Sequence, residues 1–329
     1  MDWPAPRRGL PTTRMIKPAV IFAITLLSAP AAAHVIEKSG RYAFLLTWNP
    51  DPWLIAALLA TSALYAIGLG NLRGEHTRTK LPQWRALAFC GGWLALVAAL
   101  ISPLDALGSM LFSAHMVQHE LLMLVAAPLL VLGKPLAVFV WGLPASWRRA
   151  LASPFRSNLW KRPWHRLTRP LAAWTIHAVV LWAWHAPLLF QASLRNNAIH
   201  ELQHASFLLS ALLFWWALLR GRTRLSAALY VLTTMIHTGV LGALLTFAPE
   251  PWYPLYLATT AAWGFSPLED QQLGGLIMWV PAGFVLMFAG LLLLGKWLSA
   301  QSLRNHSLRN QPLRNPDTEP VTAAHGVES

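Results

Sequence analysis

The chain has 329 residues and a formal net charge of +13, with 55% hydrophobic and only 12% charged residues. A soluble domain carries about 25% charged residues, so this composition excludes soluble globular, disordered and fibrous proteins and indicates a polytopic membrane protein. The single cysteine, Cys90, excludes an intramolecular disulfide and a thiolate metal site. No nucleic-acid-binding motif accompanies the positive charge. We therefore expect no nucleic-acid partner and interpret the charge as a topology signal.

Residues 1–33 have the features of a signal peptide, whose true start could be Met15. Lys17 precedes an apolar run over 19–27, and residues 31–33 are three alanines that suit a cleavage site. We expect cleavage after residue 33, so that the mature chain begins outside the cytoplasm. The alternative is that this segment is an uncleaved first span.

Seven later segments are apolar and about 20 residues long, which is the length needed to cross a bilayer. They lie at 52–72, 86–104, 113–133, 170–192, 202–219, 225–247 and 272–295. The sequence therefore predicts an all-α fold, a polytopic bundle of about seven transmembrane helices within residues 34–298. A basic tail follows over 299–329, and its polar composition predicts disorder.

The basic residues support one orientation of this bundle. With the mature N-terminus outside and the tail inside, nineteen of the 26 Lys and Arg residues fall in the predicted cytoplasmic segments. The outer segments hold only Lys38, Arg41 and Arg195. This distribution follows the positive-inside rule, so we expect a cytoplasmic C-terminus.

Histidines lie inside or at the edges of four predicted spans, where polar side chains are costly and usually functional. His115 and His119 are one helical turn apart and share a face, and Met123 continues that stripe. His200 and His204 form a second pair with the same spacing. Three further histidines accompany them, at His177, His185 and His237.

If these faces converge, the imidazoles form a polar site that opens toward the outer side. Neutral imidazole is the commonest protein metal ligand, and several imidazoles without thiolate suit copper or zinc. The alternative for each histidine is a structural role as a hydrogen-bonding group between helices.

Two other interpretations remain open from the residues alone. His200–His204 reads HELQH and matches HExxH, in which two histidines bind zinc and Glu201 would be the general base of an intramembrane metalloprotease. Histidines on facing helices could instead ligate a haem, for which His177, His185, His204 and His237 are candidates beside Gly239 and Gly242.

The sequence HMVQH at 115–119, followed by LLMLVAAPLLVLG at 121–133, resembles the multi-span CtaG family of bacterial cytochrome c oxidase assembly proteins. Matching stretches follow the family's order over most of residues 90–295. They are SPLD at 102–105, WHAP at 184–187, ELQH at 201–204 and DQQLGGLIMW at 270–279.

The resemblance implies a non-enzymatic factor of the bacterial inner membrane that assembles a haem-copper oxidase and supports formation of its copper centre. Its implied partners are oxidase subunit I and a periplasmic copper donor, and its implied cofactor is transiently bound copper. The family's histidines map onto His115, His119, His185, His204 and His237. His200 and Met123 would support them, and Asp105 and Asp270 would attract the cation or hydrogen-bond an imidazole. Glu120 departs from the family pattern, where an apolar residue is expected.

Overall fold

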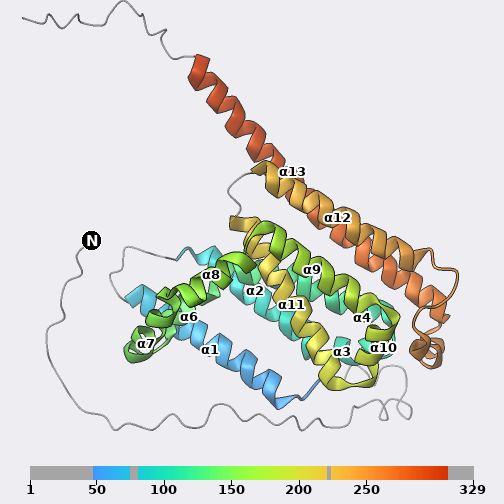
Figure 1. Cartoon of the computed structure of the whole chain (residues 1–329). Coiled ribbons are helices and arrows are strands. Elements are labelled where there is room, and N and C mark those ends of the chain that lie inside the picture. Colours follow the sequence, from blue (N-terminus) through green and yellow to red (C-terminus); the bar gives the residue numbers. More distant parts are fainter. Residues whose placement is uncertain (1–46, 75–80, 221–223, 310–329) are drawn as a thin grey trace, which may run out of the picture. The chain divides into compact units, whose positions relative to one another are not determined.

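The computed structural model describes residues 47–74, 81–220 and 224–309, and within these ranges the chain forms helices and no strand (Figure 1). The all-α fold expected from the sequence is confirmed. The expected signal peptide over 1–33 lies outside the described residues.

Six helical stretches in the described ranges are long and apolar enough to cross a membrane. Five are single α-helices, and the sixth is composite: α4 (Phe112–Glu120) leads through a π-helical turn, η4 (Leu121–Ala126), into α5 (Ala127–Gly133). The five single helices are α1 (Pro52–Gly74), α2 (Gln83–Leu100), α11 (Asn197–Arg220), α12 (Arg224–Thr246) and α13 (Pro267–Arg309).

The seventh predicted span, at 170–192, is broken. It consists of α9 (Pro170–His185) and α10 (Pro187–Arg195), whose axes differ by 72°. Pro187 disfavours a helical conformation at the preceding residue, and Ala186 accordingly has an extended backbone with ψ of 130°. Because α9 has only 16 residues, it is about 24 Å long.

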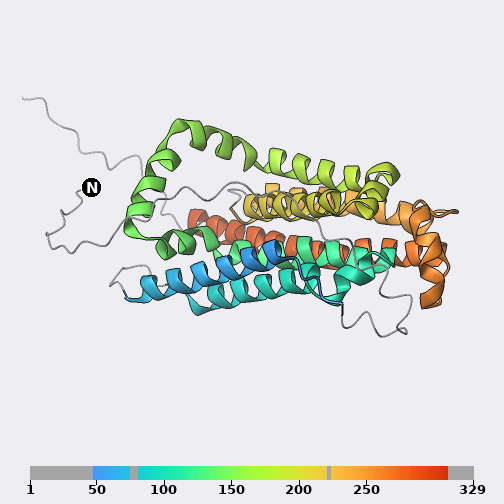
Figure 2. The same cartoon turned by 90° about the horizontal axis from the view of Figure 1, so that it is seen from below.

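Short helices connect the spans. α3 (Pro103–Gly108) precedes α4, and η5 (Pro254–Ala258) and η6 (Thr260–Trp263) join α12 to α13. Between α5 and α9 the chain forms α6 (Pro135–Gly142), α7 (Ala145–Arg156) and α8 (Asn158–Leu167). Figure 2 shows α8 leading into the start of α9, whereas α10 follows its other end.

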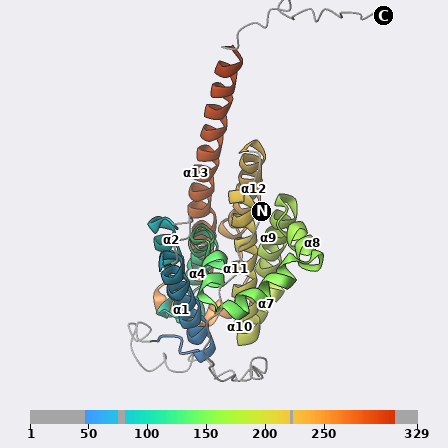
Figure 3. The same cartoon turned by 90° about the vertical axis from the view of Figure 1, so that its left-hand side faces the viewer.

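The last helix is longer than the sequence suggests. α13 continues as one helix to Arg309 (Figure 3), so the disorder expected for 299–329 does not apply to 299–309. Residues 310–329 lie outside the described part of the chain.

α12 and α13 pack closely along their lengths because small residues face the contact. A Cβ atom built on Gly242 would lie 2.6 Å from Cβ of Trp279 and 3.1 Å from the carbonyl oxygen of Gly275. Small residues at such positions let membrane helices approach closely. α13 also packs against α4, the helix that carries His115.

We expect Gly242→Ala to lower the free energy of unfolding by about 1–3 kcal/mol, because the new methyl group overpacks this contact. Gly239→Ala, one turn away on α12, is the matched control. Its Cβ would lie 3.9 Å from Cε3 of Trp279, so stability is expected to stay equal or rise, since alanine favours helix. Denaturant unfolding in detergent micelles measures both variants, and equal stability losses would contradict the assigned contact.

Candidate metal centre

Three helices bring the candidate histidine ligands together at one end of the composite span. α4 carries His115 and His119 one turn apart, the first turns of α11 carry His200 and His204, and α9 ends at His185. Figure 1 shows α3, α4 and α10 beside this end of α11. The i, i+4 spacing puts both members of each pair on one helix face, and the two faces meet.

The innermost group contains His115, His119 and His204, which are all buried. The ring centroids of His115 and His119 are 4.4 Å apart, and that of His204 lies 5.6 and 5.4 Å from them. One nitrogen from each ring lies within 4.8 Å of the others. Three nitrogens bound at about 2.0–2.1 Å to one ion lie about 3.5 Å apart, so small side-chain rotations would close the group around an ion.

Five of the six ring nitrogens of this group lack hydrogen-bond partners. Both ring nitrogens of His115 and of His119, and Nε2 of His204, are buried without a partner. Gly108 and Gln203 are polar neighbours of His115, but neither makes a hydrogen bond of normal geometry to its ring. The Gly108 carbonyl accepts from the Tyr256 hydroxyl at 2.8 Å. Buried polar groups are almost always paired. Such a set of unpaired imidazoles therefore fits a metal ion.

His185 lies beside the innermost group and is held in a defined orientation. Its Nδ1 is 2.7 Å from the Leu181 carbonyl oxygen, and its ring centroid is 6.0 Å from that of His119. Because a carbonyl can only accept, Nδ1 carries the proton and Nε2 holds a lone pair. That Nε2 is buried without a partner, and this arrangement is typical of histidine ligands.

A second group lies at the edge of the first and shares one member with it. Asp105, His200 and His204 bring ligand atoms within 4.8 Å of one another, with Asp105 and His200 only half-buried. Gln118 Nε2 and Asn49 Nδ2 donate to the Asp105 carboxylate at 2.8 and 3.1 Å. Burial raises the pKa of Asp105, whereas His200 and these two donors oppose the rise. The two groups form a continuous set from the half-buried edge to the buried interior.

Asp270 is close to the centre but does not contact an imidazole. Its carboxylate accepts from the backbone N–H groups of Phe112 and Ser113, at 2.6 and 3.1 Å, and from the Ser113 hydroxyl. It thereby caps the N-terminus of α4 from α13, where a negative charge is favourable. Asp270 thus fixes the helix that presents His115 and His119, instead of bonding a ligand ring as the sequence suggested.

His237 and Met123 lie outside the cluster. His237 is half-buried on α12, accepts from Trp182 Nε1 at 3.4 Å and packs against Trp174. Met123 sits in the π-helical turn and lines a separate cavity of about 30 Å³ with Glu120 and His177. A π-turn changes the helical register, so the stripe expected from His115 through Met123 ends at His119.

The geometry gives little support to the metalloprotease interpretation or to the haem interpretation. Glu201 is exposed and belongs to neither candidate group, although a protease would need it beside the ion. The cavity beside His177 has a volume of about 30 Å³, which holds one or two waters and not a haem.

Two buried glutamine side chains near the histidines were not predicted from the sequence. Gln118 links the Asp105 carboxylate to the Ala99 carbonyl, which it bonds at 2.6 Å. Gln203 lies fully buried next to His204, and both its amide atoms lack partners. Their position alone could have indicated them, because a polar glutamine inside an apolar membrane span is energetically costly and is usually functional.

Comparison with known proteins identifies the family of this chain. A family model described as cytochrome c oxidase caa3 assembly factor (CtaG) matches residues 63–300. The chain belongs to this family. The membership agrees with the resemblance carried by the histidine motifs, and the caa3 assembly-factor match covers all the helices that form the candidate centre.

Curated relatives of this chain come from mycobacteria. An uncharacterised protein of Mycobacterium bovis is 28% identical over 71% of this chain, and one of Mycobacterium leprae is 25% identical over 77%. The alignments cover 37% and 40% of those two proteins, so the chain spans well under half of their length. No solved structure shows significant similarity to the chain.

Proposed function

We propose that this protein supports copper insertion into a haem-copper oxidase, carrying the ion as cargo in its histidine cluster. The observation that carries the proposal is the group of buried imidazoles at His115, His119 and His204, in which five of the six ring nitrogens are buried without a partner. The family match supplies the context, because its description names assembly of a cytochrome c oxidase. The proposed role is non-enzymatic, since loading an ion breaks no covalent bond.

The donor set suits copper. Imidazole binds both copper and zinc, and among the divalent ions copper binds most tightly to such sites. His115, His119 and His204 would hold the ion, and His185 would offer Nε2 as a further ligand. Neutral imidazoles bind without adding negative charge, so the ion keeps its positive charge and remains attracted to acidic groups on a recipient.

The second group provides a route for loading and release. Asp105 and His200 are half-buried and share His204 with the interior group. An ion that arrives at this edge can exchange ligands one at a time and reach His115 and His119 without a fully unliganded step. Transfer to the oxidase would reverse the same exchanges.

The proposed setting is the bacterial inner membrane, with the histidine end of the bundle facing outward. This orientation puts α7 and α8, with their basic residues, on the cytoplasmic side, as the positive-inside rule requires. The C-terminal segment would also be cytoplasmic. A periplasmic copper donor and oxidase subunit I would then meet the protein on its outer side.

The test is the metal content of full-length protein purified in detergent from copper-supplemented cells. We expect nearly one copper per chain in the wild type and loss of most of it in His115→Ala/His119→Ala. His237→Ala is the matched control, because His237 also lies in a membrane helix but outside the cluster. Its copper content is expected to equal that of the wild type.

Four outcomes would contradict the proposal. Copper-free wild type, under conditions that load a known copper protein, would exclude the carrier role and leave only a scaffolding role in assembly. Stoichiometric zinc would favour the metalloprotease, and iron with a Soret band would favour the haem protein. Copper loss in the control variant alone would move the site to α12.

A further inference from the structure

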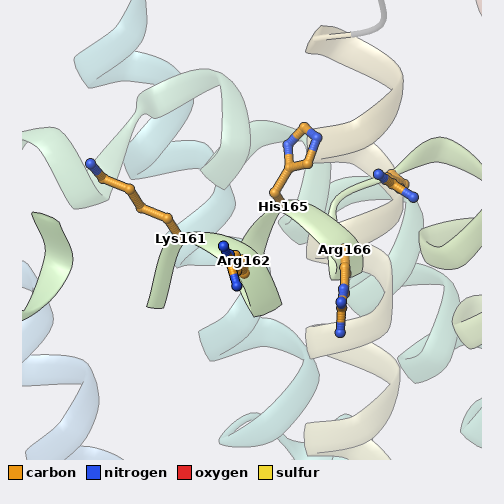
Figure 4. A pocket seen from close by; sticks show the side chains of 5 residues that line it. Lys161, Arg162, His165 and Arg166 are labelled. Atoms are coloured by element: carbon orange, nitrogen blue, oxygen red, sulfur yellow. The ribbon is translucent and has the colours of Figure 1, made fainter. Parts of the chain in front are cut away.

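Basic side chains gather on α8, which precedes the start of α9, whereas His185 of the candidate metal centre lies at the other end of α9. Lys161, Arg162, His165, Arg166 and Arg169 line an open hollow of about 400 Å³ along α8 and the turn that follows it (Figure 4). The chain has no Asp or Glu between Glu120 and Glu201. The segment that carries these cations therefore contains no acidic residue of its own.

The same helix leaves large apolar side chains exposed. In α8 no residue is buried, and Leu159 is 85% exposed. Trp160, Trp164 and Leu167 are also exposed. The apolar residues recur at i, i+1, i+5 and i+8 from Leu159, and the basic residues occupy the positions between them. α8 is therefore amphipathic, with one apolar and one basic face.

Aromatic contacts fix the level of α8 relative to the spans. Trp164 packs edge to face on Trp216, with ring centroids 5.7 Å apart. Trp216 lies in the last turns of the span α11, and the guanidinium of Arg220, the final residue of that span, stacks on it at 3.8 Å. α8 thus lies beside the end of a membrane helix, at the level of the headgroups, where tryptophan is enriched.

We propose that α8 is an interfacial helix whose basic hollow binds the headgroup phosphate of an anionic phospholipid. An apolar face and a basic face on one helix match the acyl boundary and the charged surface of an anionic leaflet. Guanidinium groups bind phosphate in a bidentate manner. A soluble anion would explain the basic face but would leave the Leu159 and Trp160 face in water.

The proposal is tested by comparing two double variants, each of which removes two positive charges. One pair of charges lies in the hollow and the other pair lies outside it. Full-length protein is delipidated in detergent and titrated with phosphatidylglycerol or phosphatidylcholine, and bound lipid is counted by native mass spectrometry. Each basic residue near an anionic surface strengthens binding by roughly fivefold. We therefore expect Arg162→Gln/Arg166→Gln to weaken phosphatidylglycerol binding by about 10- to 30-fold and to leave phosphatidylcholine binding unchanged.

Arg148→Gln/Arg149→Gln is the charge-matched control on α7. Arg148 stacks on Trp141 at 4.8 Å and Arg149 bonds the Ala145 carbonyl, so neither lines the hollow. We expect phosphatidylglycerol affinity within about threefold of the wild type for this pair. Equal losses in both double variants would show a general charge effect and overturn the proposed site.

Two further measurements test the interfacial placement of α8 and distinguish a lipid headgroup from a soluble anion. Leu159→Gln keeps every charge, and we expect it to weaken binding of both lipids, because the apolar face inserts among acyl chains. Unchanged lipid binding in this variant would overturn the interfacial placement. Millimolar inorganic phosphate should not displace phosphatidylglycerol, and displacement would show a site for soluble anions instead.

Discussion

An Asp270→Ala variant is expected to lose about 3–5 kcal/mol of unfolding free energy and to disturb the histidine cluster at the same time. The carboxylate accepts three hydrogen bonds in a buried setting, from two backbone N–H groups and the Ser113 hydroxyl. Each buried donor left without a partner costs about 1–3 kcal/mol. The lost hydrogen bonds are those of the first turn of α4, one turn before His115.

Denaturant unfolding in detergent measures the stability, and copper content measures the effect on the cluster. Ser113→Ala is the matched control, because it removes one of the three bonds and keeps both backbone contacts. We expect it to cost about 1 kcal/mol and to retain copper. If Asp270→Ala were as stable as Ser113→Ala, the capping role assigned to Asp270 would be wrong.

His204→Ala is expected to weaken copper binding by about 100-fold or more, since removal of groups that only orient a ligand already costs 10- to 100-fold. His204 is the one residue that belongs to both candidate groups. Its removal breaks the interior site and also the connection to Asp105 and His200. This expectation rests on the proposed copper-carrying function.

His200→Ala is the informative partner variant, because it removes a ligand of the edge group only. We expect copper affinity to fall by less than about tenfold and loading to slow down. Equilibrium competition with a copper chelator measures the affinity, and stopped-flow loading measures the rate. Equal losses of affinity in the two variants would contradict the division into an interior and an edge group.

Most of the fold follows from the sequence because the bilayer imposes a length on every apolar segment. The expected segments at 52–72, 113–133 and 225–247 match observed helices closely. The break at Ala186 was harder to predict, since proline inside a membrane helix is often accommodated without a break. The helical start of the tail depends on continuation of α13, which no apolar pattern marks.

The candidate site was partly predictable for a local reason. The i, i+4 spacing places His115 with His119, and His200 with His204, on single faces without knowledge of the fold. Which faces meet depends on helix packing. The sequence named both His185 and His237 as candidates, but it could not show that His185 lies beside His119 whereas His237 contacts two tryptophans.

The role of Asp270 was beyond sequence reasoning for a different reason. It bonds residues 157 and 158 positions away, and only the packing of α13 on α4 brings them together. An acidic residue near an outer helix end is equally consistent with attraction of a cation. The unpaired imidazole nitrogens likewise become visible only when the surroundings of each ring are known.

The short α9 has a consequence for the bilayer itself. At about 24 Å it falls short of a hydrocarbon core of about 30 Å, and the 72° bend turns α10 away from its axis. Lipids relieve such hydrophobic mismatch by thinning locally. The aqueous boundary is then drawn inward beside His185. Under the proposed function, an ion would cross less low-dielectric material before it meets its first imidazole.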